Sequence, residues 1–220
     1  MLPVNHEKTK FQQLQQAVPD VSRETFSKLL HYEKLFFKWS NAFNLAAPST
    51  LQDFWQRHIV DSAQLVKSIK PSGKWIDIGS GGGLPGVVMA IFLTESGAEP
   101  IHLVESNGKK AAFLRTALNE TATKGIVHAV RIEDSYAKTG PADVVTARAL
   151  ASLSKLLELA EPWIGNGAQG IFHKGREFQR EIDDAHGDRE FDLVERTSVV
   201  SHDSVILEIR NLKRKKSTGA

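Results

Sequence analysis

A glycine-rich turn between two apolar segments constrains the fold of this chain more than any other feature. The segment Trp75–Ile78 is apolar except for Asp77, residues 79–86 read Gly-Ser-Gly-Gly-Gly-Leu-Pro-Gly, and the apolar segment Val87–Leu93 follows. This order predicts a strand, a tight turn and a helix, the first crossover of a parallel α/β sheet. Glycines allow positive φ and the close approach of a ligand, and the free N–H groups of a helix start attract anionic groups. We therefore expect a nucleotide-like cofactor at this turn.

The glycine spacing alone leaves the cofactor open. Gly81, Gly83 and Gly86 fit the G-x-G-x-x-G pattern of dinucleotide sites. Asp77 with the alternate glycines that follow it fits the pattern of S-adenosylmethionine-dependent methyltransferases equally well. Glycine-rich turns also occur for purely conformational reasons. Residues further along the chain have to separate these interpretations.

Length and composition set outer bounds. A chain of 220 residues suits one α/β domain with a terminal extension. No apolar run is long enough to span a bilayer and Met1–Lys10 is too polar for a signal peptide, so we expect a cytoplasmic protein without membrane contact. The sequence has no cysteine, which excludes disulfides, cysteine-zinc sites and thiol nucleophiles.

Positive charge is concentrated at the carboxyl end. The net charge of the chain is +2, and the four residues at 213–216 (Lys-Arg-Lys-Lys) contribute +4 of it, so the rest of the chain has a net charge of −2. A basic tail over residues 213–220 on a near-neutral body predicts contact with a polyanion such as nucleic acid. The alternative is a solvated terminus with no binding role.

The hydrophobic pattern divides the chain into a helical extension and an alternating region. Residues 1–72 form the predicted N-terminal extension. Its first predicted helix has the start signals Pro19-Asp20 and Ser22, and its second runs from Ser49 or Thr50 to about Ile69. Residues 73–212 form the predicted methyltransferase domain. Its expected strands are Trp75–Ile78, Ile101–Glu105, Ile126–Ile132, Asp143–Ala147, Gly170–His173, Phe191–Val200 and Ser204–Asn211. Only the short polar link Ser201-His202-Asp203 joins the last two strands, so they should pair antiparallel. The predicted fold is α/β, a doubly wound seven-stranded Rossmann-like methyltransferase sheet with an antiparallel terminal hairpin.

Acidic residues at successive strand ends favour one cofactor. In doubly wound sheets the ligand lies over the carboxyl ends of the strands. Asp77 ends the first predicted strand, Glu105 ends the second, where it can accept hydrogen bonds from ribose hydroxyls, and Ile132 and Glu133 follow the third, where they can flank an adenine ring. This ordered set favours S-adenosylmethionine over NAD.

The fourth predicted strand runs into Arg148, where methyltransferases of this fold present substrate-facing residues. The Asp/Asn-Pro-Pro-aromatic arrangement for an exocyclic amine is absent there. Guanine N7 remains a plausible target, because its lone pair is free at neutral pH. Transfer would then need positioning and no general base. We therefore predict no catalytic side chain, with Arg148 as the one possible exception, although a structural ion pair is an equally good interpretation of this arginine.

Taken together, the motifs resemble the bacterial glucose-inhibited division protein B family, which makes 7-methylguanosine in small-subunit (16S) ribosomal RNA. The resemblance extends from about Trp39 to Lys174. It rests on Asn44-Leu45, residues 57–62 (Arg-His-Ile-Val-Asp-Ser), residues 77–86, Lys109-Lys110, residues 113–115 (Phe-Leu-Arg), residues 148–153 (Arg-Ala-Leu-Ala-Ser-Leu) and Lys174-Gly175. Ala46 departs from the threonine that the family often has after Asn-Leu.

The resemblance implies roles for particular residues. Gly79 and Leu84 would contact the cofactor, Ile132 and Glu133 would border its adenosine, and Arg148 would close the site. Our own reasoning adds Asp77, Gly81 and Glu105 to the cofactor residues. We expect RNA contacts from Arg57, His58, Lys109, Arg115 and Lys174.

Further expectations concern the His-x-x-Asp spacing, the partners and the alternative functions. His58 and Asp61 lie one helical turn apart, which suits a hydrogen-bonded pair or the rim of a substrate site better than a metal site, because no third ligand is near. The expected partner is 16S rRNA or a small-subunit assembly intermediate, and the expected oligomeric state is a monomer. A small-molecule methyltransferase of the same fold, a non-catalytic cofactor-binding module and an NAD dehydrogenase are the alternatives.

Overall fold

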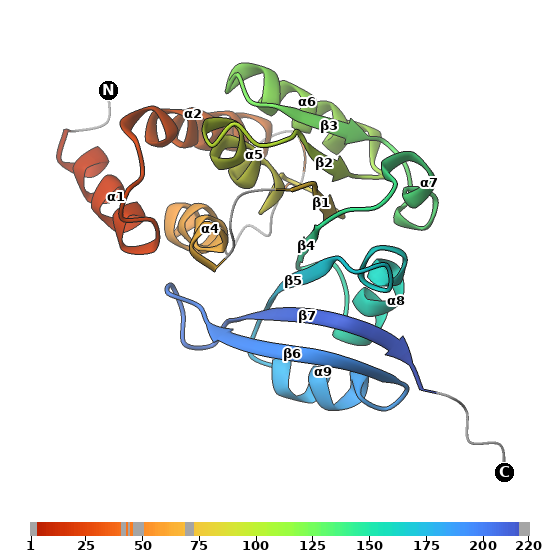
Figure 1. The fold of residues 1–220 in the computed structure, drawn as a ribbon. Coiled ribbons are helices and arrows are strands. Elements are labelled where there is room, and N and C mark those ends of the chain that lie inside the picture. Colours follow the sequence, from red (N-terminus) through yellow and green to blue (C-terminus); the bar gives the residue numbers. More distant parts are fainter. Residues whose placement is uncertain (1–3, 41–42, 44, 46–50, 69–72, 216–220) are drawn as a thin grey trace, which may run out of the picture.

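A seven-stranded sheet forms the centre of the protein (Figure 1). The computed structural model describes residues 4–40, 43, 45, 51–68 and 73–215. The strand order is β3-β2-β1-β4-β5-β7-β6. The strands are β1 (Trp75–Ile78), β2 (Ile101–Val104), β3 (Gly125–His128), β4 (Val144–Arg148), β5 (Gln169–Lys174), β6 (Arg189–Thr197) and β7 (Val205–Arg214). The first five strands are parallel and β7 is antiparallel to both β5 and β6, which confirms the predicted fold class and terminal hairpin.

Helices cover both faces of this sheet. They are α1 (Val4–Ala17), α2 (Arg23–Ser40), the π-helical segment η2 (Trp55–Val60), α3 (Asp61–Ala63), α4 (Leu65–Ser68), α5 (Gly86–Glu95), α6 (Gly108–Glu120), the 3₁₀ turn η3 (Ile132–Asp134), α7 (Tyr136–Thr139), α8 (Leu153–Ile164) and α9 (Phe178–Ala185). One hydrophobic cluster joins α1, α2, η2, α5 and α6, and a second joins α8 and α9 to β4, β5 and β7. The central strand β1 is buried along its whole length between these two layers.

The N-terminal helices α1 and α2 belong to the same hydrophobic cluster as α5 and α6, on one face of the sheet. Ser22 caps α2 as its sequence position predicts, since its Oγ accepts the Thr25 N–H at 3.0 Å. The ring of Phe36 in α2 lies 6.0 Å from that of Phe113 in α6. Between α1 and α2, the Lys10 ammonium and the Glu33 carboxylate form a buried pair at 2.6 Å. The extension is therefore packed against the helices that flank the glycine turn.

Three predicted strand ends are wrong by three or four residues, while the other strand boundaries differ from the prediction by at most two. The third strand ends at His128 instead of Ile132, because the chain leaves the sheet there and residues 132–134 form η3. The sixth strand ends at Thr197 instead of Val200. The seventh continues to Arg214, because its last residues pair with the start of β6.

The longer β7 changes the interpretation of the basic tail. Lys213 and Arg214 belong to the sheet, and the Arg214 guanidinium lies 3.0 Å from the Glu161 carboxylate. Lys215 donates from Nζ to the His186 carbonyl at 2.6 Å. Lys216 lies outside the described residues. Of the predicted tail, residues 213–215 are thus bound to the folded body. Among the described residues, no helix has both the length and the apolar character needed to cross a membrane.

Candidate active site

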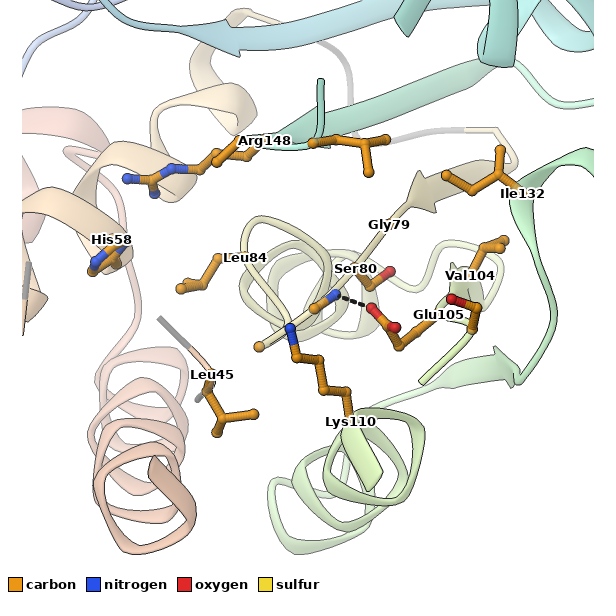
Figure 2. A pocket seen from close by; sticks show the side chains of 15 residues that line it. Leu45, His58, Gly79, Ser80, Leu84, Val104, Glu105, Lys110, Ile132 and Arg148 are labelled. Carbon is orange, nitrogen blue, oxygen red and sulfur yellow. Dashed lines mark hydrogen bonds between the residues drawn. The ribbon is translucent and has the colours of Figure 1, made fainter. Parts of the chain in front are cut away.

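A cavity of about 470 Å³ opens at the carboxyl ends of β1, β2 and β4 (Figure 2). This size lies within the ordinary range of small-molecule sites, and the position is the one where doubly wound sheets bind ligands. Figure 2 shows Ile132, Val104 and Glu105 on one side and Arg148 extending toward His58 on the other. The full lining is Leu45, His58, Gly79, Ser80, Gly81, Gly82, Leu84, Val104, Glu105, Ser106, Lys110, Ile132, Arg148, Ala149 and Leu150.

The glycine turn forms the floor of this cavity and is held from several sides. Gly79 and Gly81 have φ of +67° and +53°, a backbone region that residues with a side chain rarely adopt. The Ser80 N–H donates to the Val104 carbonyl at 2.9 Å. From α2, the buried Tyr32 hydroxyl donates to the Gly82 carbonyl at 2.5 Å. The N-terminal extension therefore contributes directly to the conformation of the turn.

Glu105 connects the glycine turn to the loop after β2. Its side chain is buried but lines the cavity, with the residue 8% exposed. Oε2 accepts the Gly81 N–H at 2.8 Å and Oε1 accepts the Asn107 N–H at 2.7 Å. Each carboxylate oxygen has two acceptor sites, so both can still accept a hydroxyl hydrogen from a ligand. The predicted ribose contact is compatible with this geometry and stays a prediction.

Asp77 lies behind the glycine turn and is not part of the cavity lining. The residue is 1% exposed, and its Oδ1 accepts the Thr146 hydroxyl at 2.8 Å. The other oxygen packs against Gly86 at the start of α5. Burial raises the pKa of Asp77 to about 7. This side chain therefore supports the glycine turn from within the core, and the predicted contact of Asp77 with the cofactor stays a prediction.

The predicted adenosine residues have different environments. Ile132 of η3 lines the cavity on the same side as Val104 (Figure 2). Glu133 is exposed and its carboxylate lies 3.7 Å from the Arg131 guanidinium. Its side chain is outside the lining, so the predicted contact of Glu133 with adenosine could come only from its backbone or from a rearranged side chain.

Arg148 closes one side of the cavity through buried contacts. Its Nη1 lies 3.4 Å from Oδ2 of Asp61, and Nη2 donates to the Arg57 carbonyl. Burial lowers the pKa of the guanidinium, and the nearby Asp61 opposes that effect. The next residue, Ala149, has φ of +49°, a conformation that costs a residue with a side chain about 1–2 kcal/mol. Strain of this kind at a strand end in a cavity is typical of functional sites.

The residues predicted to contact RNA do not form one surface. Arg57 is exposed, and its guanidinium lies 3.9 Å from Asp53. Lys109 and Arg115 lie on the exposed side of α6. Lys174 is buried, where its ammonium lies 2.5 Å from the Glu181 carboxylate and donates to the Ala151 carbonyl at 2.7 Å. The geometry therefore favours a structural role for Lys174.

His58 is buried beside the cavity and does not form the hydrogen-bonded pair with Asp61 that the spacing allowed. Neither ring nitrogen of His58 has a hydrogen-bond partner among the described residues. The Asp61 carboxylate bonds instead with Ser198 Oγ and Gln64 Nε2, at 2.8 and 2.6 Å. In the part of the chain that the structure describes, no group of three or more His, Asp or Glu is arranged to hold a metal ion.

Sequence reasoning missed several lining residues, namely Leu45, Ser80, Gly82, Val104, Ser106, Lys110, Ala149 and Leu150. Val104 and Ser106 flank Glu105 at the strand end, so the same strand-end argument could have included them. Lys110 follows the Asn107 cap of α6, whose Oδ1 accepts the N–H groups of residues 109 and 110 at 3.0 and 3.2 Å. That capping signal was available in the sequence.

Comparisons with known proteins agree on one family. Residues 25–211 match the family model GidB, described as rRNA small subunit methyltransferase G. The chain is 55% identical over 206 residues to ribosomal RNA small subunit methyltransferase G of Brucella canis, which covers 94% of this chain and 97% of that protein. The corresponding protein of Brucella ovis is 54% identical over the same length.

Solved structures show the same fold at low sequence identity. An O-methyltransferase from Bacillus cereus in complex with SAH has a TM-score of 0.55 and 13% identity, covering 82% of this chain and 91% of that one. A fibrillarin/Nop5p complex also has a TM-score of 0.55 and 13% identity, covering 70% and 81%. These likenesses concern the fold alone.

Proposed function

This chain belongs to the GidB family, rRNA small subunit methyltransferase G, and from that premise we propose that it methylates N7 of a guanine in 16S rRNA with S-adenosylmethionine as donor. The observation that carries the proposal is the cavity over the strand ends, in which the glycine turn and the Glu105 carboxylate are fixed to each other. In this proposal the protein is a cytoplasmic monomer, and its substrate is 16S rRNA or a small-subunit assembly intermediate.

The cavity residues fit the cofactor chemically. Glu105 offers acceptor sites for ribose hydroxyls, while Ile132 and Val104 offer apolar surface for a purine ring. The space beside Gly81 is open, since a Cβ built there would meet nothing closer than the Gly79 carbonyl at 3.7 Å. The ammonium of Lys110 faces the same space and suits a carboxylate. These features support the assignment of S-adenosylmethionine to this cavity.

The chain's own residues would bind and orient the reactants without moving a proton. When bound, S-adenosylmethionine supplies an activated methyl group, which the N7 lone pair attacks while the C–S bond breaks and its electrons remain on sulfur. N7 carries no hydrogen, so no side chain has to act as a general base. Arg148, held by Asp61 and the Arg57 carbonyl, would position the acceptor beside the cavity.

Two experiments test the proposed function. Small-subunit RNA from a strain that lacks the protein should lose one 7-methylguanosine, mapped by borohydride-aniline cleavage. The purified protein should restore it with S-adenosylmethionine, and parallel assays on free 16S rRNA and on small-subunit particles would identify the preferred substrate. Unchanged cleavage in the deletion strain, or restoration of a different modification, would refute the guanine N7 assignment.

The pH dependence distinguishes N7 from other acceptors. Single-turnover methylation should be nearly flat between about pH 6 and 8.5, because no acceptor group has to be deprotonated. A log-linear rise in rate over that range would indicate an amine or hydroxyl target. A small-molecule methyltransferase would instead act on low-molecular-weight acceptors and leave 16S rRNA unmodified. A non-catalytic module would bind S-adenosylhomocysteine and transfer no methyl group.

A further inference from the structure

We propose that the target guanine occupies a second cavity on the far side of His58 and Arg148, and that the His58 imidazole hydrogen-bonds to the base. This inference rests on the proposed function, which requires an acceptor site next to the cofactor cavity. The second cavity has a volume of about 480 Å³ and is lined by Arg57, His58, Asp61, Arg148, Gly175, Arg176, Val200, Ser201, Asp203 and Ser204.

The position of this cavity suits direct transfer. His58 and Arg148 line both cavities, so they form the wall between the two spaces. A methyl acceptor has to reach its donor from an adjoining space with the reacting atoms about 3–3.5 Å apart. His58 and Arg148 lie on the side of the first cavity that is opposite Ile132 (Figure 2), and both residues also line the second cavity. A base held there would face the methyl group instead of the adenosine.

Both residues of this wall have buried nitrogens without a hydrogen-bond partner among the described residues. Arg148 Nη1 still lies 3.4 Å from the Asp61 carboxylate, whereas the His58 ring has no such counterpart. The residue is only 7% exposed, and neither Nδ1 nor Nε2 finds a hydrogen-bond partner among the described residues. Its ring packs against Phe54 with centroids 5.1 Å apart, which fixes its orientation. Buried polar atoms in native proteins almost always have partners, so an orphaned imidazole at a cavity wall indicates that a ligand supplies them.

The chemistry of a neutral imidazole matches guanine. Burial, together with the neighbouring guanidinium of Arg148, lowers the pKa of His58 to about 4, so the ring carries one N–H donor and one acceptor at neutral pH. On guanine, the O6 acceptor lies next to N7 on the same edge, where adenine carries an amino donor. An N–H group of His58 directed at O6 would therefore hold N7 in place and favour guanine.

Charge distinguishes this cavity from one other cavity beside the cofactor site. A cavity on the other side of Leu150 is lined by the acids Glu177, Glu181 and Asp184 with a single arginine, a surface that repels phosphate. The second cavity has three arginines and two acids. Both acids already face an arginine, because Asp61 lies 3.4 Å from Arg148 and Asp203 lies 2.8 Å from Arg176.

Arg57 is left as the cation that can contact RNA phosphate. Its side chain is 57% exposed, and the carboxylate of Asp53 lies 3.9 Å from the guanidinium, the limit of an ion pair. The side chain stands at the edge of the second cavity, within the same lining as His58. A nucleotide whose base enters beside His58 would place its phosphate near this arginine.

Two substitutions of His58 test the proposed contact. His58→Phe keeps the ring shape and its packing on Phe54 but removes both nitrogens, whereas His58→Asn keeps one donor and one acceptor. With a buried hydrogen bond lost, kcat/KM for 16S rRNA methylation should fall about 5- to 100-fold in His58→Phe, and His58→Asn should recover most of that loss. S-adenosylhomocysteine affinity, measured by calorimetry, should change less than about threefold in both.

Two blocking substitutions test the cavity itself. Ser201→Trp would fill the mouth of the second cavity and should abolish RNA methylation with little effect on S-adenosylhomocysteine affinity. Asp184→Trp introduces the same side chain into the acidic cavity and should leave methylation within about twofold of wild type. Far-ultraviolet circular dichroism and thermal melting show whether each variant is folded.

The outcomes separate this inference from the proposed function. If the wild-type protein does not methylate 16S rRNA, the proposed function fails. If the wild type is active but folded His58→Phe and Ser201→Trp are equally active, the acceptor site is elsewhere and the inference is refuted. If S-adenosylhomocysteine affinity falls as much as methylation in His58→Phe, the imidazole serves the methyl donor instead of the guanine, which also refutes it.

Discussion

Removal of the Glu105 carboxylate should weaken both the glycine turn and cofactor binding. Its two oxygens accept the N–H groups of Gly81 and Asn107 at 2.8 and 2.7 Å. Hydrogen bonds to a charged group contribute about 1.5–3 kcal/mol each. Water can enter the cavity and hydrate the two freed amides, so the net loss of folding free energy in Glu105→Ala should be about 2–3 kcal/mol, less than the sum of both bonds.

The effect on binding can be estimated separately. If Glu105 also accepts a ribose hydroxyl, the loss of that bond costs a further 1.5–3 kcal/mol or so, which corresponds to roughly a 10- to 150-fold weaker affinity. Isothermal titration calorimetry with S-adenosylhomocysteine measures this directly. Urea unfolding of the free protein measures the contribution of the two backbone contacts without any ligand.

Two further variants sharpen the test. Glu105→Gln keeps the shape but has an NH2 group in place of one of the two accepting oxygens, so one N–H group loses its acceptor and the variant should lie between wild type and Glu105→Ala in stability and in affinity. Glu99→Ala removes an exposed carboxylate before the amino end of the same strand and should change neither quantity. A folded Glu105→Ala protein that binds S-adenosylhomocysteine within twofold of wild type would refute the ribose contact.

Three other predictions follow from buried contacts around the site. The pKa of Asp77 is raised to about 7 from 3.8, so between these values the native state holds a proton that the unfolded state has lost. The free energy of unfolding should therefore fall by up to about 4 kcal/mol between pH 4 and 7 through this group. In Asp77→Asn, the free energy of unfolding measured by urea titration should depend less on pH over this range. Gly86→Ala would place a Cβ 2.4 Å from the Asp77 carboxylate and should cost about 1–3 kcal/mol, whereas Gly108→Ala enters open space and should melt within a few degrees of wild type. Ser198→Ala removes the hydroxyl that donates to Asp61 at 2.8 Å and should lower 16S rRNA methylation about three- to tenfold at unchanged S-adenosylhomocysteine affinity, while Ser198→Thr should restore it.

The fold could be predicted because local signals agreed with one another along the chain. The glycine turn and the alternation of apolar segments both indicated a doubly wound sheet, Ser22 indicated the start of a helix in the extension, and the short link before Val205 indicated a hairpin. Strand ends were less certain. Apolar residues continue to Ile132, but that side chain packs at the cavity wall after the backbone has left the sheet at His128. Periodicity does not reveal where pairing stops.

The sequence predicted which strand ends form the candidate site. It did not predict which side chains at those ends point into the cavity. Asp77 and Glu105 both end strands at the same edge of the sheet, yet only Glu105 faces the cavity. Because β1 is buried on both faces, alternation along it does not show which side the carboxylate occupies. The same difficulty applies to Lys174, whose partner Glu181 comes from the following helix.

The predicted basic tail illustrates a limit of charge counting. The cluster that begins at Lys213 is conspicuous in the sequence, but Arg214 is neutralised by Glu161 of α8 and is part of a strand. Such a pair depends on the register between β6 and β7 and on the packing of α8, which no local pattern encodes. A truncation that tests RNA binding by the terminus should therefore start after Lys215, because an earlier end would remove part of β7.

The terminal hairpin has a second connection to the site, through Asp61. The carboxylate of Asp61 is buried, and a buried charge is tolerated only when its oxygens are satisfied. Ser198, at the end of β6, and Gln64 together satisfy Oδ1, which leaves Oδ2 to face the Arg148 guanidinium at 3.4 Å. The tip of the hairpin approaches α4 for this reason (Figure 1). The position of Arg148 beside the proposed acceptor cavity therefore depends on three segments that are distant in sequence. Disruption of the hairpin should lower the rate of RNA methylation more than it lowers the affinity for the cofactor.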